Sequence, residues 1–204
     1  MSDIRLSSGN RHEGVFTMVF HEDDVLILNR CDFRRWLEWN HSSAKECYIV
    51  VNRSNKGDSL HYIDAVEEAL CFGWIDSTVR KIDGLGTIQR FSPRHKDSHF
   101  TELNKARCER LERLGLMTES GRVALGHAPA FQIDRDIMEV LSDDPVVYEN
   151  FMSFPELYRK IRIDNIQSCR ESYPDTFRKR LEKFVENTRN GVMYGKWDDD
   201  GRLS

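Results

Sequence analysis

Hydrophobic residues recur along this chain at two spacings, and each spacing predicts one type of element. Short apolar runs with the length and β-branched content of strands occupy residues 15–20, 25–28, 47–51, 74–81 and 87–91. The last two flank a Gly-rich turn at 83–86, so we expect them to pair as a hairpin. The polar segment 52–59 lies between predicted elements and indicates a loop.

Helical spacing accounts for most of the remaining chain. It predicts a short helix capped by Asp32 and further helices over residues 62–72, 98–114, 120–127, 135–141, 155–168 and 174–190. In the 98–114 helix, Ser98 is the expected cap. Leu103, Ala106 and Leu114 are expected to form its inward face.

The order of these elements predicts the fold class. Strands are concentrated in the first half and helices in the second, which favours an α+β fold over a doubly wound sheet. We expect a small antiparallel sheet with packed helices, followed by a helical C-terminal part. The expected regions are an N-terminal extension at 1–24, an α+β core at 25–127, a helical subdomain at 128–191 and a tail at 192–204.

Composition narrows the class of protein. The 204 residues include 30 basic and 34 acidic side chains, with a net charge of −4 and 39% hydrophobic residues. These values exclude collagen-like and low-complexity disordered chains. No run approaches the ~18 apolar residues of a spanning helix, and the N-terminus lacks the apolar stretch of a signal peptide. We therefore expect no membrane insertion and a cytoplasmic location.

The cysteines agree with a reducing compartment. There are five of them, widely spaced and without a CxxC pair. An odd count with this spacing argues against a disulfide framework and against a structural zinc site. We expect all five to be reduced and most of them to be buried.

Basic charge gathers in one segment. Residues 80–107 hold seven Lys or Arg against three Asp or Glu. A solvated face with internal ion pairs is the ordinary explanation, and an anion-binding surface is the more specific one. The overall negative charge argues against a nucleic-acid-binding surface, because such surfaces are usually basic.

The common motifs for cofactors and metals yield no site. The chain has no GxGxxG, no P-loop and no GxSxG elbow, so we expect no cofactor. His95 and His99 have the i, i+4 spacing of zinc ligands, but Pro93 lies just upstream and the general base of an HExxH motif is absent. We therefore expect a surface loop there and no metal.

One group of residues remains as a candidate site. If the hairpin forms, Asp76 and Arg90 are expected to meet at its open end, where the helix that carries Glu68 enters and where Trp74 and Arg94 also lie. Two carboxylates, two arginines and an indole in one place can bind an anion or move a proton. Glu68 and Asp76 are thus acid/base candidates, and the other three are ligand-binding candidates. The competing interpretation is a buried ion-pair network that fixes the helix–hairpin junction.

Residues 67–76, EEALCFGWID, resemble the central signature of the YdeI/OmpD-associated family, also called the bacteriocin-protection family. Other segments that resemble this family lie at 36–41, 89–94, 98–104, 114–121 and 137–191. The segment 98–104 adds Asn104 to the ligand-binding candidates. It departs from the family pattern at His99 and Phe100, where the family usually has Lys or Arg followed by Trp.

The resemblance implies an α+β domain with a helical tail, in a bacterial cytoplasmic protein linked to stress or antimicrobial-peptide protection, with no established reaction. The leading hypothesis is a protection protein that binds an anionic small molecule or a partner protein. One alternative is an enzyme that uses Asp76 or Glu68 as acid/base. Another is nucleic-acid binding through residues 80–107. The sequence leaves the oligomeric state open.

Overall fold

The structure is a computed structural model that describes residues 25–53 and 60–203. In chain order its elements are β1 (Val25–Leu26), α1 (Arg30–Asn40), β2 (Cys47–Val51), α2 (Tyr62–Cys71), β3 (Trp74–Ile82), β4 (Gly86–Pro93), α3 (Glu102–Arg113), α4 (Glu119–Gly126), α5 (Arg135–Ser142), α6 (Pro145–Ser153), α7 (Glu156–Gln167) and α8 (Pro174–Arg189). The strand predicted at 15–20, the extension at 1–24 and most of the 52–59 loop lie outside the described residues.

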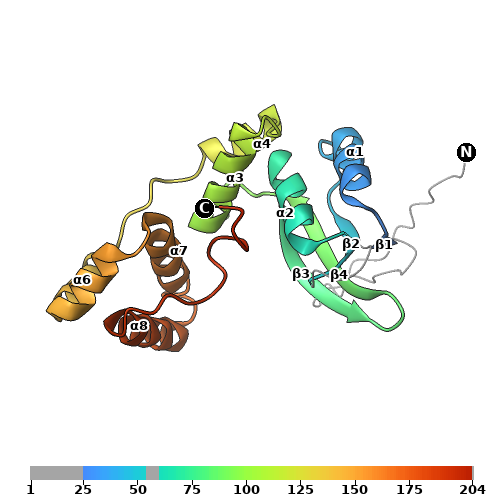
Figure 1. Cartoon of the computed structure of the whole chain (residues 1–204). Helices are drawn as coiled ribbons and strands as arrows, with labels where there is room; N and C mark the ends of the chain where they lie inside the picture. Colours follow the sequence, from blue (N-terminus) through green and yellow to red (C-terminus); the bar gives the residue numbers. More distant parts are fainter. Residues whose placement is uncertain (1–24, 54–59, 204) are drawn as a thin grey trace, which may run out of the picture.

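The first half forms a four-stranded sheet in the order β1-β2-β4-β3. β4 pairs antiparallel with both β2 and β3, as the predicted hairpin requires, whereas β1 runs parallel to β2. The α+β fold class is confirmed, and the parallel β1 makes the sheet mixed rather than wholly antiparallel. The sheet and helices α1 and α2 lie at one end of the molecule, and α5–α8 lie at the opposite end (Figure 1).

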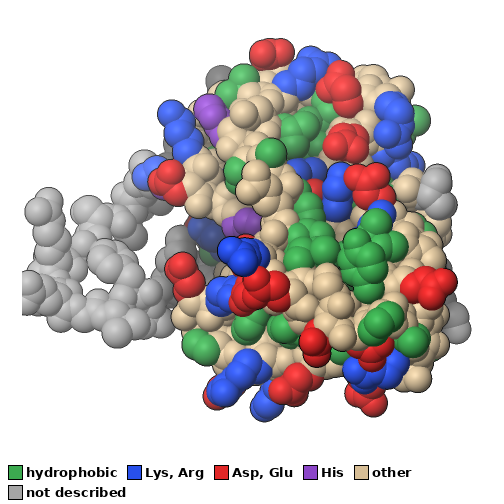
Figure 2. All heavy atoms as spheres, turned by 90° about the vertical axis from the view of Figure 1, so that its left-hand side faces the viewer, with side chains coloured by type: hydrophobic (Ala, Val, Ile, Leu, Met, Phe, Trp, Pro, Cys, Tyr) green, Lys and Arg blue, Asp and Glu red, His purple; other side chains and the backbone are tan. Residues whose placement is uncertain are grey.

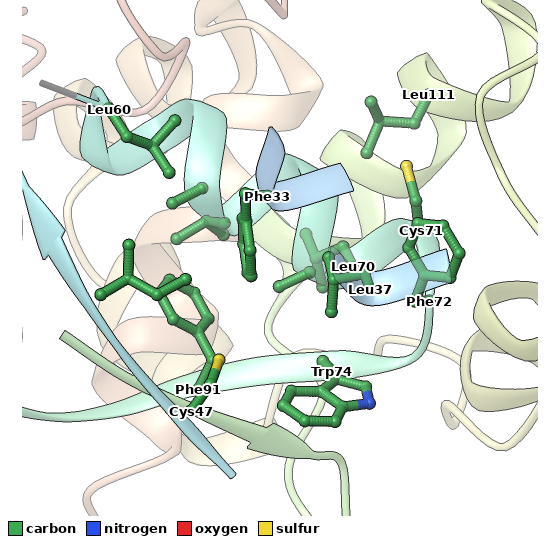
Figure 3. Close-up of a cluster of buried hydrophobic side chains, with 14 of the residues drawn as sticks. Phe33, Leu37, Cys47, Leu60, Leu70, Cys71, Phe72, Trp74, Phe91 and Leu111 are labelled. Carbon is green, nitrogen blue, oxygen red and sulfur yellow. The ribbon is translucent and has the colours of Figure 1, made fainter. Parts of the chain in front are cut away.

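The core of the first half lies between the sheet and helices α1 and α2 (Figure 3). Phe33 of α1 packs on Phe91 of β4 with 5.5 Å between ring centroids. Trp36 meets the edge of Trp74 at 5.7 Å. Phe72, which follows α2, is buried. Gly73 follows at φ +74, a left-handed conformation that lets the chain reverse directly from α2 into β3.

The second half has a core of its own, formed by α5–α8. Phe151 of α6 and Tyr158 of α7 both pack against Phe184 of α8. Sequence periodicity missed α6 altogether. The signal that could have found it is the pair Asp144 and Pro145, because Asp144 caps α6 and Pro145 occupies its first turn.

Two predicted helix caps were wrong by a few residues. α1 begins earlier than predicted because Asn29, not Asp32, is its cap and accepts from the Asp32 N–H. α3 begins later because Thr101, not Ser98, is the cap and accepts from the Asn104 N–H. Asp and Ser are as common as caps as Asn and Thr, so residue type alone does not identify the cap.

The inward face of α3 also differs from the prediction. Leu114 is 54% exposed, and Leu103 and Ala106 are only partly buried. The buried positions are instead Glu102, Asn104, Arg107, Cys108 and Leu111. α3 therefore buries polar side chains, and each of these needs a partner inside the protein.

Residues 192–203 return from α8 to the first half, and the C-terminus lies beside α3 in Figure 1. Trp197 packs edge-on against Tyr158, with 5.7 Å between centroids. Beyond it, Asp199 pairs with Arg107 of α3, and Arg202 pairs with Asp64 of α2 at 2.7 Å. We call residues 192–203 the C-terminal strap. It contacts the second core through an aromatic ring and the first half through one buried and one partly buried ion pair.

Candidate functional site

A hollow of about 470 Å³ lies between the open end of the β3–β4 hairpin and the segment that leads into α3. We call it the hairpin cleft. Three of the predicted site residues line it: Asp76 on β3, Arg94 directly after β4 and Asn104 in the first turn of α3. The structure thus brings together half of the six candidates, and the other three lie elsewhere.

Arg94 is the cation of the hairpin cleft. Its Nη1 donates to the backbone oxygen of His99 at 3.0 Å, and its guanidinium lies 4.0 Å from the ring centroid of Phe100. Its Nε is buried without a hydrogen-bond partner. Within residues 25–53 and 60–203 no carboxylate forms an ion pair with Arg94, and burial lowers the pKa of its guanidinium.

Asp76 is the anion of the same cleft. Its Oδ2 accepts a hydrogen bond of 2.6 Å from the Tyr62 hydroxyl on α2. Burial, together with the charge of Asp76, raises the pKa of Tyr62. Asp76 forms no ion pair with any Lys or Arg that the structure describes. The carboxylate is therefore held in place by a neutral donor and not by an ion pair within the described residues.

Asn104 connects the cleft to the interior of the protein. Its side-chain oxygen accepts from Arg107 Nη1 at 2.8 Å. Arg107 in turn donates to both oxygens of Asp199, at 2.6 and 2.8 Å. Burial alone would lower the pKa of Arg107, but the hydrogen bonds and charge of Asp199 raise it. Because its oxygen is occupied, Asn104 can offer its NH₂ group to a ligand.

His99 stands at the wall between the hairpin cleft and a second hollow of about 430 Å³ beside α7. Its Nε2 lies 2.8 Å from Asp164 Oδ1, and the Glu102 N–H donates to the other oxygen of Asp164. Burial raises the pKa of Asp164. This contact joins the start of α3 to α7, and it places a basic group where the family pattern has Lys or Arg.

Glu68 does not reach the cleft. Its two oxygens accept from Arg30 and Arg34 of α1, at 2.7 and 2.8 Å. Arg30 also pairs with Asp64 and Glu67. The prediction that Glu68 joins Asp76 was wrong because α1, which packs on α2, supplies closer cations. For Glu68 the competing interpretation, a structural ion-pair network, describes the geometry.

Trp74 is also removed from the cleft. Its indole is 1% exposed, and its N–H donates to the His41 backbone oxygen at 3.1 Å. A helix-facing strand position explains this burial, because Trp74, like Asp76, points to the side that α2 covers. In the described structure Trp74 supports the site from the core and presents no surface to a ligand.

Arg90 lies on the opposite face of the sheet from Asp76. The register pairs Asp76 with Phe91, which faces the helices, so the adjacent Arg90 faces away. Arg90 pairs with Glu46 at 2.7 Å and donates to the Ser77 hydroxyl at 2.9 Å. The prediction that Asp76 and Arg90 lie together was wrong, because Asp76 pairs with Phe91 and not with Arg90.

The basic segment 80–107 is partly neutralised by the fold. Arg90 pairs with Glu46, Lys105 with Glu102 and Arg107 with Asp199. On the helical end of the molecule, charges of both signs are interspersed with small apolar patches (Figure 2). Neither observation matches the continuous basic track that nucleic-acid phosphates require.

Nowhere in 25–53 or 60–203 do three or more His, Cys, Asp or Glu side chains come together as a group able to hold a metal ion. None of the helices in this part of the chain has both the length and the apolarity to cross a bilayer.

Sequence reasoning missed the residues that organise the cleft from behind. Each of these residues forms a hydrogen bond with a cleft residue or with a residue that contacts one. They are Tyr62, His99, Asp164, Arg107 and Asp199. The available signals were the polar positions on the buried face of α3 and the acidic run in the strap, and neither identifies its partner.

Comparison with known proteins divides the chain in two. Residues 130–191 match the family described as Bacteriocin-protection, YdeI or OmpD-Associated, and residues 25–124 match a domain of unknown function. No curated protein and no solved structure matches the chain. The family resemblance seen in the sequence is confirmed for 130–191, whereas the hairpin cleft belongs to the part matched by the domain of unknown function.

Proposed function

The chain carries a YdeI/OmpD-associated domain at residues 130–191, and from this premise we propose that its first half binds a small anionic molecule in the hairpin cleft. Arg94 and Asn104 are the proposed ligand-binding residues. The observation that carries the proposal is the state of Arg94, a partly buried guanidinium that lines the cleft and has no carboxylate partner within 25–53 and 60–203.

The chemistry of this side chain supports an oxyanion as ligand. A guanidinium presents its N–H groups in one plane, which matches the two oxygens of a carboxylate or phosphate. Stacking on Phe100 and the bond to the His99 backbone fix the orientation of that plane. A bound anion would supply the countercharge that this partly desolvated cation lacks.

An enzymatic use of the same cleft is the second candidate, and one observation favours it. Asp76 lines the cleft and is held 2.6 Å from the Tyr62 hydroxyl, so a proton acceptor faces the proposed ligand. Glu68 is no longer an acid/base candidate, because Arg30 and Arg34 occupy both of its oxygens. Binding is the function that both candidates share, so it is tested first.

The test is anion-dependent stabilisation of the full chain. Inorganic phosphate and acetate should raise the melting temperature of the parent, whereas Arg94→Gln should show little or no rise. Arg135→Gln is the matched control, because Arg135 is 93% exposed on α5 and does not line the cleft. An equal rise in Arg94→Gln, or no rise in the parent, would contradict the proposal.

We further propose that this binding serves stress or antimicrobial-peptide protection in the cytoplasm. The description of the C-terminal family supports this in part, because it names bacteriocin protection. The measurement is survival of a deletion strain under bacteriocin challenge, complemented by the parent, Arg94→Gln or Arg135→Gln. Protection by the parent and by Arg135→Gln, but not by Arg94→Gln, is expected. Equal protection by all three proteins would contradict the proposal that ligand binding in the cleft is needed for protection.

A further inference from the structure

The hairpin cleft contains two opposite charges that do not neutralise each other. Arg94 and Asp76 both line it, and no ion pair forms between them. Neither side chain pairs with another charged group within 25–53 or 60–203. By contrast, Arg30, Arg34 and Arg107 all have carboxylate partners.

Separate anchors hold the two charges apart. Asp76 is tied to α2 through the Tyr62 hydroxyl. Arg94 is tied to the segment before α3 through the His99 backbone and the Phe100 ring. The negative charge of Asp76 acts to raise the pKa of Arg94, so the two groups sense each other, yet burial outweighs it and lowers that pKa. Both side chains line the same cleft.

The rest of the lining is chemically mixed. It combines hydroxyl side chains with two apolar residues and two imidazoles: Ser92, Ser98, Thr101, Ile75, Pro93, His95 and His99. A volume of about 470 Å³ lies within the range of small-molecule sites. Hydroxyls can donate to an anion and accept from a cation, so this lining is compatible with either end of a small charged molecule.

We propose that the hairpin cleft binds a small zwitterion, with its carboxylate on Arg94 and its ammonium group on Asp76. This inference rests on the proposed anion binding and names the class of ligand. A plain anion bound to Arg94 would leave Asp76 without a countercharge, and a plain cation bound to Asp76 would leave Arg94 without one. Only a molecule with both charges gains from both side chains, which is how paired charges create specificity.

The experiment compares probes that differ by a single ammonium group. Glycine, β-alanine and γ-aminobutyrate are titrated calorimetrically into the full chain, each against its matched acid, acetate, propionate or butyrate. At least one amino acid should bind roughly tenfold more tightly than its acid, and the best of the three reports the spacing between the charges. Inorganic phosphate is titrated as the simple-anion reference.

Variants assign the effect to each side chain. Asp76→Asn keeps an acceptor for the Tyr62 hydroxyl but loses the charge, so the amino acid and its acid should bind with equal affinity. Arg94→Gln should weaken both. Asp83→Asn is the control, since Asp83 is exposed at the far end of the same hairpin and should leave the preference unchanged. Melting curves confirm that each variant is folded.

The outcomes separate this inference from the proposed function. Equal binding of acids and amino acids by the parent, or binding of phosphate alone, would overturn the zwitterion and leave anion binding intact. A preference for amino acids that survives in Asp76→Asn would overturn the role of Asp76. Absence of binding by all seven probes would overturn both proposals.

Discussion

The carboxylate of Asp199 lies against the guanidinium of Arg107 in a two-point contact, with nitrogen–oxygen distances of 2.6 and 2.8 Å. Both side chains are buried, at 2% and 7% exposure, and they come from positions 92 residues apart. The pair holds the C-terminal strap on α3 directly behind the cleft residue Asn104. A segment without regular secondary structure therefore completes the interior of the first half.

Replacing Asp199 by Asn should destabilise the protein strongly, because Arg107 would keep its charge without a countercharge. Removing one partner of a buried pair costs roughly 3–5 kcal/mol. The measurement is the free energy of unfolding in urea. The double variant with Arg107→Met should recover part of the loss, and a cycle that shows no coupling between the two positions would contradict the assigned role of the strap.

The network around Glu68 makes a contrasting pair of predictions. Glu68→Gln leaves Arg30 and Arg34 facing a neutral amide at a buried position, so it should cost about 3 kcal/mol. Arg90→Gln breaks a more accessible pair on the outer face of the sheet and should cost about 1 kcal/mol or less. Chemical denaturation of both variants tests the order. The reverse order would contradict the placement of Glu68 in a structural network.

Phe72 tests the packing between α1, α2 and α4. Its ring lies 5.2 Å from the His41 ring centroid and 5.3 Å from the Arg34 guanidinium. Phe72→Ala should cost roughly 3–5 kcal/mol, as expected for a buried aromatic residue. Trp39→Ala is the control, because Trp39 is 75% exposed and its loss should change stability by no more than about 0.5 kcal/mol. Similar melting temperatures for both variants would contradict the burial of Phe72.

The cysteines predict a labelling pattern. Cys31 is exposed and the other four are buried, with no disulfide among them. In native protein without reductant, one thiol should react rapidly with a maleimide, and five should react after denaturation. Mass spectrometry of the labelled peptides identifies the site. Fewer than five reactive thiols in denaturant would reveal a disulfide and contradict the proposal of a cytoplasmic location.

The same thiols predict how stability changes at alkaline pH. Burial raises the pKa of Cys47 and Cys108 to about 12 and that of Cys71 to about 11, above the ordinary value of 9.0. Unfolded chains therefore lose these protons at lower pH than folded ones. The free energy of unfolding should fall as pH rises from about 9 to about 12. The slope should be reduced in Cys47→Ala, and an unchanged slope would contradict burial as its cause.

Local patterns predicted most of the first half well, for physical reasons that can be named. The run at 47–51 is β2 with the same bounds, because β-branched residues there fill the space under α1 and α2. The turn at 83–86 produced the hairpin, with Gly84 and Gly86 both in the left-handed region. Neither inference needed information from distant residues.

The site was harder to predict because it depends on register and on distant partners. Asp76 and Arg94 were found as cleft residues, but Arg90 fell on the other face after a shift of one position. A bulge follows Asp76, where the Gln89 side-chain NH₂ donates to the backbone oxygens of Ser77 and Thr78. It has no sequence signature strong enough to fix that register. Pairings across 92 residues leave no local pattern at all.

The C-terminal strap also determines when the interior of the first half can be completed during translation. Arg107 is synthesised 92 residues before Asp199, an interval of roughly 5–20 s at bacterial and eukaryotic elongation rates. Throughout that time water must solvate its guanidinium, so the nascent α3 cannot close its polar face. The first half of the chain is thus synthesised first, but its interior is completed only after α5–α8 have been synthesised.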